Sequence, residues 1–167
     1  DAEGRPRVVA GVPPDYFSDT GQLWGNPIYD WDRQRDDGWS WWLQRLRRVL
    51  AQTDLIRLDH FRGFAAYWVV PPDAEDARPG HWVQGPGVGF FEAVRDALGE
   101  LPLVAEDLGE IDQPVHDLRE AVGLPGMKVL QFAFGAQPDH PFLPHTYPRH
   151  CVAYTGTHDN NTTLGWW

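Results

Sequence analysis

The stretch Leu101-Pro102-Leu103-Val104-Ala105-Glu106 is an apolar run that ends in a carboxylic acid, and Leu55-Ile56-Arg57-Leu58-Asp59 is a similar run earlier in the chain. Short apolar runs bounded by turn residues predict buried strands. Residues 128–134 and 151–155 follow the same pattern and predict two further strands. Polar residues follow the first, second and fourth of these strands, so the sequence predicts a cluster of polar groups at one end of a sheet.

Helical patterns separate these strands. Apolar residues recur at helical spacing from Trp39 to residue 50, with Ser40 as a possible N-cap, and again over 90–98 and 115–122. The last two patterns stop at Gly99 and Gly123, and glycine commonly follows a helix. Strands that alternate with helices predict parallel βαβ units. Residues 8–38, 65–88 and 135–150 are rich in glycine, proline or histidine and are predicted to be loops.

Four parallel strands fit either a small doubly wound sheet or part of a (β/α)8 TIM barrel. A doubly wound sheet usually carries a glycine-rich phosphate loop after its first strand, and no such fingerprint is present. Barrel enzymes place polar groups at the ends of their strands, and a complete barrel needs about 250 residues. We therefore predict an α/β fold in which residues 1–167 form a partial catalytic (β/α)8 domain. It would hold about four central strand–helix units, lack both ends of the barrel, and begin with a loop that flanks the substrate.

Composition and charge argue against a nucleic-acid-binding, membrane-spanning or secreted protein. The formal net charge is −10, which argues against a nucleic-acid partner because such binding needs clustered lysine and arginine. No apolar run approaches the roughly 18 residues that span a bilayer, and the N-terminus lacks the pattern of a signal peptide. Cys151 is the single cysteine, which excludes an internal disulfide. The sequence thus predicts a cytoplasmic protein without a membrane partner.

Two acids at strand ends are candidates for catalysis. Residues two apart on a strand point the same way, so Arg57 is expected to lie beside Asp59 and to keep it ionised, as a nucleophile requires. A purely structural Arg–Asp pair fits the same spacing. Glu106 follows an apolar run, and such surroundings raise the pKa of a carboxyl group, as a general acid requires.

Asp159 comes just after the fourth strand, next to His158. Two carboxylates on neighbouring strand ends suit retaining glycoside chemistry, which needs roughly 5–5.5 Å between them. A metal site built from Asp59, His60, His158 and Asp159 is the competing possibility, because His and Asp are common metal ligands. No HExxH or paired-cysteine spacing supports it, and we predict neither a metal nor a cofactor.

Several longer motifs resemble the 4-α-glucanotransferases, which are the amylomaltases or disproportionating enzymes of glycoside hydrolase family 77. The resemblance covers essentially the whole chain, with gaps near 73–88 and 136–149. The motifs, in order, are residues 9–18 (VAGVPPDYFS), 21–27 (GQLWGNP), 56–64 (IRLDHFRGF), 105–109 (AEDLG), 123–128 (GLPGMK) and 154–160 (YTGTHDN).

The resemblance implies a (β/α)8 barrel with inserted subdomains and retaining transfer of an α-1,4-glucan segment. By motif match, Asp59 is the nucleophile, Glu106 the acid/base and Asp159 the stabiliser of the transition state. The implied partners are α-1,4-glucans and maltooligosaccharides, with glucose as an acceptor. The implied substrate-binding residues are Arg57, His60 and His158 around the sugar at the cleaved bond, and Trp24, Gln22 and Asp15 in a loop that flanks the glucan.

Three alternatives stay open at this level. An α-amylase-type hydrolase has related acids on a similar barrel and would convert maltotriose only into smaller sugars. A non-catalytic glucan-binding module would not need its acids. Finally, a chain that lacks several barrel strands would neither fold nor work by itself, because open strand edges and apolar faces would be exposed.

Overall fold

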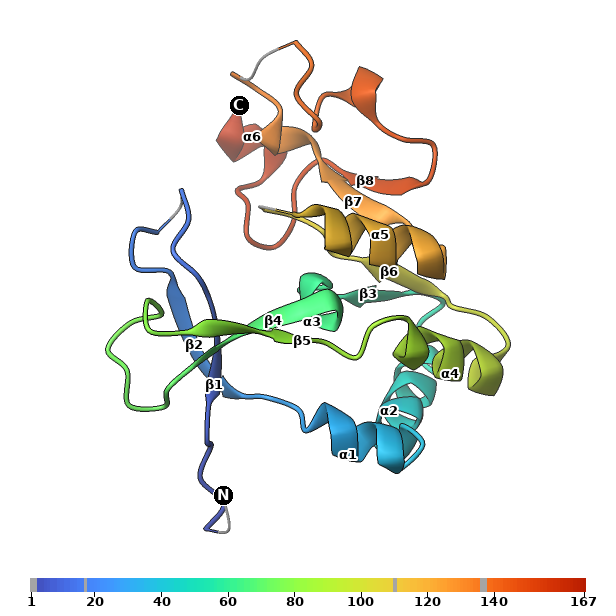
Figure 1. Cartoon of the computed structure of the whole chain (residues 1–167). Helices are drawn as coiled ribbons and strands as arrows, with labels where there is room; N and C mark the ends of the chain where they lie inside the picture. Colours follow the sequence, from blue (N-terminus) through green and yellow to red (C-terminus); the bar gives the residue numbers. More distant parts are fainter. Residues whose placement is uncertain (1–2, 17, 110, 136–137) are drawn as a thin grey trace.

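Two kinds of sheet make up this mixed α/β fold, which a computed structural model describes for residues 3–16, 18–109, 111–135 and 138–167. Parallel strands with helices beside them occupy the centre and top of Figure 1, and an antiparallel sheet lies at the lower left. The N-terminus is at the end of the antiparallel sheet, and the C-terminus lies beyond the parallel strands.

The parallel strands are those that the apolar runs predict. Strands β3 (Ile56–Leu58) and β6 (Leu103–Ala105) form one parallel ladder. Strands β7 (Gly126–Val129) and β8 (Cys151–Tyr154) form a second. The amide of Ala105 donates a hydrogen bond to the carbonyl of Pro125 at 2.9 Å, so β6 lies next to β7. The four strands therefore follow one another in the order β3, β6, β7, β8 (Figure 1).

The boundaries of the third predicted strand were wrong. The prediction gave residues 128–134, whereas β7 ends at Val129 and a 3-10 helix, η1 (Leu130–Phe132), follows it. The ladder with β8 runs from Gly126 opposite Cys151 to Val129 opposite Tyr154, and the chain then turns into η1, from which the Gln131 amide still donates to the carbonyl of Thr155 at 3.2 Å. Strand boundaries depend on the partner strand, which local sequence does not contain.

The three predicted helices are confirmed as α2 (Ser40–Leu50), α4 (Val88–Leu98) and α5 (Gln113–Val122). The proposed N-cap of α2 was wrong. The cap position is Trp39, in the left-handed region with φ 60°, and the Ser40 hydroxyl donates to the Asp37 carboxylate instead. The remaining helices are short: α1 (Trp31–Asp36), α3 (Arg62–Ala65), α6 (Thr163–Trp166) and the 3-10 turn η2 (Pro144–Thr146).

Two of the predicted loops contain strands, and these predictions were wrong. Within residues 8–38 lie β1 (Val9–Val12), β2 (Gln22–Pro27) and α1, and within 65–88 lie β4 (Ala66–Val70) and β5 (His81–Gln84). They form an antiparallel sheet in the order β2-β1-β4-β5. Every residue of β2 is exposed, so this strand has no alternation of apolar and polar residues to reveal it.

Aromatic residues dominate the main core, which lies between the helices and the strand pair β3–β6. Phe61, Phe90 and Phe91 have no exposed surface, and Phe64 and Trp42 pack against Phe90 with ring centroids 5.1 and 5.4 Å apart. Burying rings of this size is strongly favourable. The core therefore anchors the segment after β3 and the helix before it, and so holds the carboxyl end of β3 in place.

The glycines at the helix ends give a matched pair for a stability prediction. Gly123 follows α5 with φ 71°, whereas Gly89 sits in the first turn of α4 without a positive φ, and a methyl group at either position would meet open space. We expect Gly123→Ala to lower the free energy of unfolding by about 1 kcal/mol, because the left-handed region disfavours a Cβ. Gly89→Ala is expected to raise it by up to about 1 kcal/mol, because alanine is the better helix former. The midpoints of thermal unfolding should rank Gly89→Ala, parent, Gly123→Ala, and any other order contradicts the prediction.

Candidate active site

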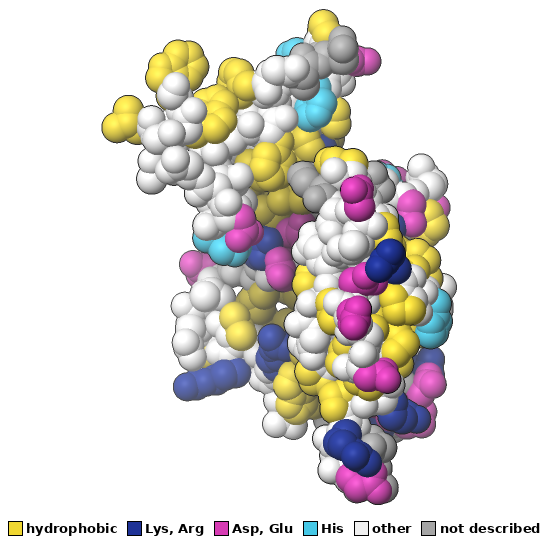
Figure 2. Space-filling view, turned by 90° about the vertical axis from the view of Figure 1, so that its left-hand side faces the viewer, with side chains coloured by type: hydrophobic (Ala, Val, Ile, Leu, Met, Phe, Trp, Pro, Cys, Tyr) yellow, Lys and Arg dark blue, Asp and Glu magenta, His cyan; other side chains and the backbone are white. Residues whose placement is uncertain are grey.

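One pocket of about 870 Å³ collects most of the predicted site residues at the carboxyl ends of the parallel strands. Figure 2 shows acidic, basic and histidine side chains gathered beside a hollow on this side of the molecule. Eight of the nine predicted residues line the pocket: Asp15, Gln22, Trp24, Arg57, Asp59, His60, Glu106 and Asp159. His158 does not.

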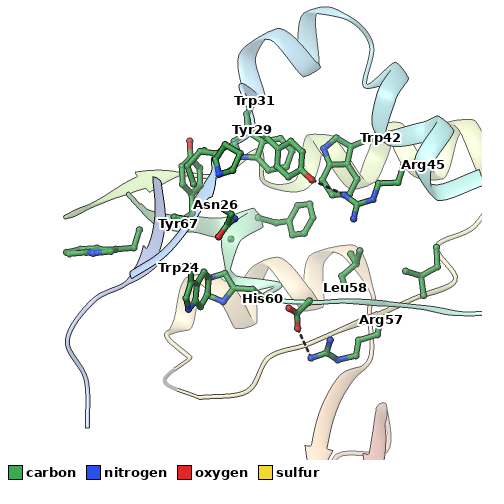
Figure 3. Close-up of a pocket in the computed structure, with 18 of the residues that line it drawn as sticks. Trp24, Asn26, Tyr29, Trp31, Trp42, Arg45, Arg57, Leu58, His60 and Tyr67 are labelled. Carbon is green, nitrogen blue, oxygen red and sulfur yellow. Dashed lines mark hydrogen bonds and ion pairs between the residues drawn. The ribbon is translucent and has the colours of Figure 1, made fainter. Parts of the chain in front are cut away.

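A second cavity of about 620 Å³ adjoins the first and shares Trp24, Arg57, Asp59 and His60 with it. Figure 3 shows that aromatic side chains from the N-terminal part of the chain line it, with the Tyr29 hydroxyl accepting a hydrogen bond from Arg45 at 2.8 Å. The two cavities meet at Trp24 on β2 and at the carboxyl end of β3.

Asp59 directly follows β3 and forms an ion pair with Arg57, as the strand spacing predicts. The Nη2 atom of Arg57 lies 2.7 Å from Oδ1 of Asp59 (Figure 3). The Asp59 side chain is 76% exposed, so its second oxygen is open to the pocket. Arg57 is also held from the other side, since its Nε donates to the sulfur of buried Met127 at 3.3 Å. The pair therefore keeps a charged carboxylate at a fixed place on the pocket wall.

Glu106 follows the strand that pairs with β3. Leu58 is the ladder partner of Ala105, so Asp59 and Glu106 are the next residues on two neighbouring parallel strands. Both oxygens of the Glu106 carboxylate accept hydrogen bonds from main-chain amides. Oε2 accepts from the amide of His60 at 2.7 Å, and Oε1 accepts from the amide of Leu108 at 3.0 Å.

The electrostatics of Glu106 suit a general acid. Burial is the largest influence and raises the pKa of this carboxyl group, and the nearby negative charge of Asp59 raises it further. The two main-chain hydrogen bonds and the charge of Arg57 oppose the rise without cancelling it. Two carboxyl groups on adjacent strands thus occupy different environments, one exposed and paired with arginine, the other desolvated. Such a difference separates an acid from a nucleophile.

His60 is held in an unusual conformation between these acids. Its φ is 47°, in the left-handed region, and its ring meets that of Trp24 edge-on with centroids 4.8 Å apart. Burial lowers the pKa of His60 to about 4, with a further lowering by Arg62 and an opposing effect of Asp59. The ring is therefore neutral at neutral pH and can both donate and accept hydrogen bonds in the pocket.

This low pKa predicts a pH-dependent contribution to stability. The folded state binds the His60 proton less tightly than the unfolded chain does, so the contribution is complete above about pH 6.5 and is lost as the pH falls toward 4. The lost stability is at most about 3 kcal/mol, because the ring is partly exposed. His60→Asn removes the titration and tolerates the left-handed backbone. Its thermal midpoint should fall less than that of the parent between pH 7 and 4.5, and parallel curves would refute the assignment.

Asp159 and His158 lie in the loop after β8. The Asp159 side chain is 75% exposed, lines the large pocket and lies 3.4 Å from Nε2 of His158. Asn160 shapes this loop, since its Oδ1 accepts from the amide and the hydroxyl of Thr157 at 2.8 and 3.0 Å. His158 is 74% exposed, and it does not line the large pocket formed by the described residues but lies next to Asp159, which does. The role of His158 in binding the sugar stays a prediction.

The flanking residues come from the antiparallel sheet. Trp24 and Gln22 lie on β2, and the indole Nε1 of Trp24 donates to Oε1 of Gln22 at 3.1 Å. Asp15 lies in the turn between β1 and β2, where its Oδ1 accepts from the amide of Ser18 at 2.9 Å. Edge strand β2 thus carries one wall of the pocket, although its residues were predicted to form a loop.

Known proteins match the chain along its whole length. A profile of the 4-alpha-glucanotransferases of glycoside hydrolase family 77 matches residues 2–167. The chain belongs to this family. The 4-alpha-glucanotransferase of Thermus thermophilus is 57% identical over 169 residues, and that of Streptococcus pneumoniae (strain TIGR4) is 53% identical over 167, each match covering 100% of this chain. Amylomaltase from Streptococcus agalactiae, solved in complex with acarbose, superposes with a TM-score of 0.92 and 42% identity over 99% of this chain.

The chain spans about a third of the length of these family members. It covers 34% of the Thermus thermophilus protein, 33% of the Streptococcus pneumoniae protein and 34% of the Streptococcus agalactiae chain. Among the described residues, no helix is long and apolar enough to cross a membrane. The cytoplasmic location stays a prediction.

Sequence reasoning missed several residues of this family member's pocket. Arg62 contacts the Trp82 ring, with its guanidinium carbon 4.3 Å from the ring centroid, and forms an ion pair with Asp112 at 2.5 Å. Phe132 and Phe142 meet edge-on at 5.4 Å on another wall. All four of Arg62, Trp82, Phe132 and Phe142 line the large pocket. The abundance of aromatic residues in loop-like segments was the available signal, but it did not say which of them share a pocket.

The residues that could form the alternative metal site are Asp59, His60, His158 and Asp159. In the described part of the chain, no group of three or more His, Cys, Asp and Glu side chains is arranged to hold a metal ion. The groups around Asp59 are instead a guanidinium, an imidazole of low pKa and a second carboxyl group. This set of groups suits proton transfer and nucleophilic attack.

Proposed function

We propose that this chain is part of a 4-alpha-glucanotransferase, which transfers a segment of α-1,4-glucan to the 4-hydroxyl of glucose or of another α-1,4-glucan with retention of configuration. The observation that carries the proposal is the register of β3 and β6. It makes Asp59 and Glu106 neighbours at one end of a parallel ladder, in a pocket that Asp159 also lines. Family membership supplies the class of reaction.

In the first half of the reaction, an Asp59 oxygen attacks the anomeric carbon of the bound glucan. The bond from this carbon to the glycosidic oxygen breaks, and Glu106 gives its proton to that oxygen, which leaves as the 4-hydroxyl of the released glucan. The glycosyl group is now an ester of Asp59. The ion pair with Arg57 supports this step, because the guanidinium holds the attacking carboxylate in place at 2.7 Å.

In the second half, Glu106 is a carboxylate and acts as a base. It takes the proton from the 4-hydroxyl of an acceptor, whose oxygen attacks the anomeric carbon and displaces Asp59. Two inversions give net retention, and the enzyme returns to its starting protonation. The raised pKa of Glu106 supports this exchange, because the carboxyl group then keeps its proton at a higher pH than an ordinary glutamate does.

The other predicted residues bind the sugar. Asp159 would hold hydroxyls of the distorted ring, with contacts that strengthen in the transition state. Neutral His60 offers both a donor and an acceptor, and Trp24 offers a flat apolar surface beside it. The proposed binding set is Arg57, His60, His158, Trp24, Gln22 and Asp15, with maltooligosaccharides and longer glucans as ligands. The acarbose complex of the Streptococcus agalactiae amylomaltase supports a ligand of this kind.

The fold supports a partial barrel. Within the described residues, β3 pairs only with β6, and β8 pairs only with β7, so the outer edge of each is unpaired. Open edges of a parallel sheet normally have neighbours. We infer that residues 1–167 are a central segment of a (β/α)8 catalytic domain, and that the strands which close the barrel belong to the full-length enzyme.

The experiment is incubation of the full-length enzyme with maltotriose alone, with products separated by chromatography. Transfer predicts glucose together with maltopentaose and longer oligomers. An α-amylase-type hydrolase would give only sugars shorter than maltotriose, and a non-catalytic module would give no products. Either of these results would overturn the proposed function.

A further inference from the structure

Asp107 is a nearly buried carboxylate directly after the proposed acid/base, and it does not line the pocket. Its side chain is 9% exposed and points into the seam between β6 and β7. Oδ1 accepts a hydrogen bond from the amide of Met127 at 2.7 Å, and Oδ2 lies 3.2 Å from Nε of Arg119 on α5. A charge this far from water needs partners, and Asp107 has one from each of two elements.

The Asp107 side chain replaces part of the main-chain hydrogen bonding between β6 and β7. Where β6 meets the beginning of β7, the described residues form one main-chain hydrogen bond, from the amide of Ala105 to the carbonyl of Pro125, the residue just before β7. In a regular parallel ladder the Met127 amide would donate to a main-chain carbonyl of β6. The Asp107 carboxylate accepts it instead, so the main chain of β6 is free to turn after Ala105 and to bring Glu106 to the His60 and Leu108 amides.

Gly126 leaves the space that the carboxylate fills. A Cβ built on Gly126 would lie 2.4 Å from Oδ2 and 2.8 Å from Oδ1 of Asp107. These distances are well inside van der Waals contact, so any side chain at this position would displace the Asp107 carboxylate. The Asp107 carboxylate therefore packs directly on Gly126 while it accepts the hydrogen bond from the amide of Met127.

The contacts continue from Met127 to the nucleophile. Met127 is 1% exposed, and its sulfur accepts from Nε of Arg57 at 3.3 Å. The other end of the Arg57 guanidinium holds Asp59 at 2.7 Å. A hydrogen bond to a thioether is weak. Met127 is nevertheless buried, and Asp107 holds its main chain, so its side chain gives Arg57 a packing partner in a fixed position.

We propose that Asp107 is a positioning residue that sets the separation of the two catalytic carboxylates. It acts on Glu106 through the peptide bond that joins them, and on Asp59 through Met127 and Arg57. The inference rests on the proposed function, in which this separation governs nucleophilic attack and proton transfer together. Asp107 touches neither the substrate nor the reacting atoms.

The test compares Asp107→Asn, Gly126→Ala and Met127→Leu in the full-length enzyme with maltotriose as substrate. Asp107→Asn weakens the ionic contact with Arg119, Gly126→Ala displaces the carboxylate with its charge intact, and Met127→Leu removes the sulfur with little change of volume. We expect kcat to fall about 10- to 100-fold in the first two and about 10-fold in the third, with KM within about two-fold, because misplacement by about 1 Å slows the chemical step. The double variant Asp107→Asn/Met127→Leu is expected to lose less than the product of the single losses, because both changes act on one path.

A second substrate distinguishes the effect of Asp107 on Asp59 from its effect on Glu106. α-Maltosyl fluoride has a leaving group that needs little protonation, so its first step reports on Asp59 more than on Glu106. The Asp107→Asn and Met127→Leu losses should persist with the fluoride. Full recovery with the fluoride would mean that Asp107 acts through Glu106 alone, and it would overturn the inference.

The control is Asp96→Asn, which removes an exposed carboxylate from α4 and should leave both kinetic constants unchanged. Normal kcat in Asp107→Asn and Met127→Leu, with an active parent, would overturn the positioning role and leave the proposed function intact. A parent without transfer activity would overturn the proposed function and this inference with it. If Asp107→Asn does not fold, Met127→Leu and its response to the fluoride decide.

Discussion

Replacing Asp59 by Asn is expected to lower kcat/KM for the disproportionation of maltotriose by about 10⁴-fold or more, the largest effect we expect of any single substitution, because no covalent intermediate can form. Asparagine keeps the shape of the side chain but loses the negative charge that attacks the anomeric carbon. The ion pair with Arg57 is partly exposed, so its loss should change the free energy of unfolding by no more than about 1 kcal/mol. The fall in activity would then be a chemical effect and not a consequence of unfolding.

Initial rates of glucose release measure the loss, and a trapping experiment identifies the atom. The parent enzyme, mixed with α-maltosyl fluoride and quenched in acid, should carry a maltosyl ester on the peptide that contains Asp59. The ester should be absent from Asp59→Asn and from Asp59→Ala, whose side chain cannot deamidate back to the acid. Asp96→Asn serves as the control for removal of an exposed carboxylate. Activity within 10-fold of the parent in both Asp59 variants would show that another group is the nucleophile.

Glu106→Gln is expected to reduce kcat on maltotriose by about 10²- to 10⁴-fold, the range that general acid–base groups contribute. Glutamine is similar in size but carries no transferable proton. The rate of the first step should recover with α-maltosyl fluoride, because departure of fluoride needs little help from an acid. The second step still lacks its base, so the glycosyl-enzyme should accumulate, and azide, a nucleophile without a proton to remove, should speed its turnover.

The pH dependence of kcat/KM tests the role of Glu106 independently. Glu106 must be protonated for the first half of the reaction, so kcat/KM is expected to fall as the pH rises through its pKa. Burial and the charge of Asp59 raise that pKa, which keeps the acid form present at higher pH than for an ordinary glutamate. This basic limb should disappear from the profile of Glu106→Gln with the fluoride substrate. A limb that stays unchanged in the variant would assign it to a different group.

The parts of the fold that could be read from the residues are those with a local cause. The apolar runs 55–59 and 101–106 and the three predicted helices contribute to one hydrophobic core, and the periodicity of each follows from which of its faces is buried. Gly99 and Gly123 end their helices because only glycine adopts the left-handed region without strain. The closeness of Asp59 and Glu106 could also be predicted, because neighbouring parallel strands end at the same edge of a sheet.

The antiparallel sheet could not be read in this way. Strand β1 pairs with β4 across more than fifty intervening residues, and β2 is exposed along its whole length. Neither strand shows an alternating pattern, because their order comes from hydrogen bonds to distant main-chain groups. Residues 8–38 and 65–88 therefore resembled loops, although Trp24 and Trp82 are held on strands that wall the pocket.

The catalytic constellation divides along the same line. The positions of Asp59 and Glu106 after their strands and the pairing of Arg57 with Asp59 follow from local sequence, because strand periodicity and strand ends are local properties. The predicted roles of these two acids and of Asp159 come from the family motifs around them. The left-handed turn at His60, the main-chain grip on Glu106 and the contact of Met127 with Arg57 join residues from β3, β6 and β7. Tertiary packing alone creates these contacts, because each one needs a partner brought from another strand. The sequence by itself therefore identified the three acids as candidates, and the tertiary structure determined the surroundings of Asp59 and Glu106.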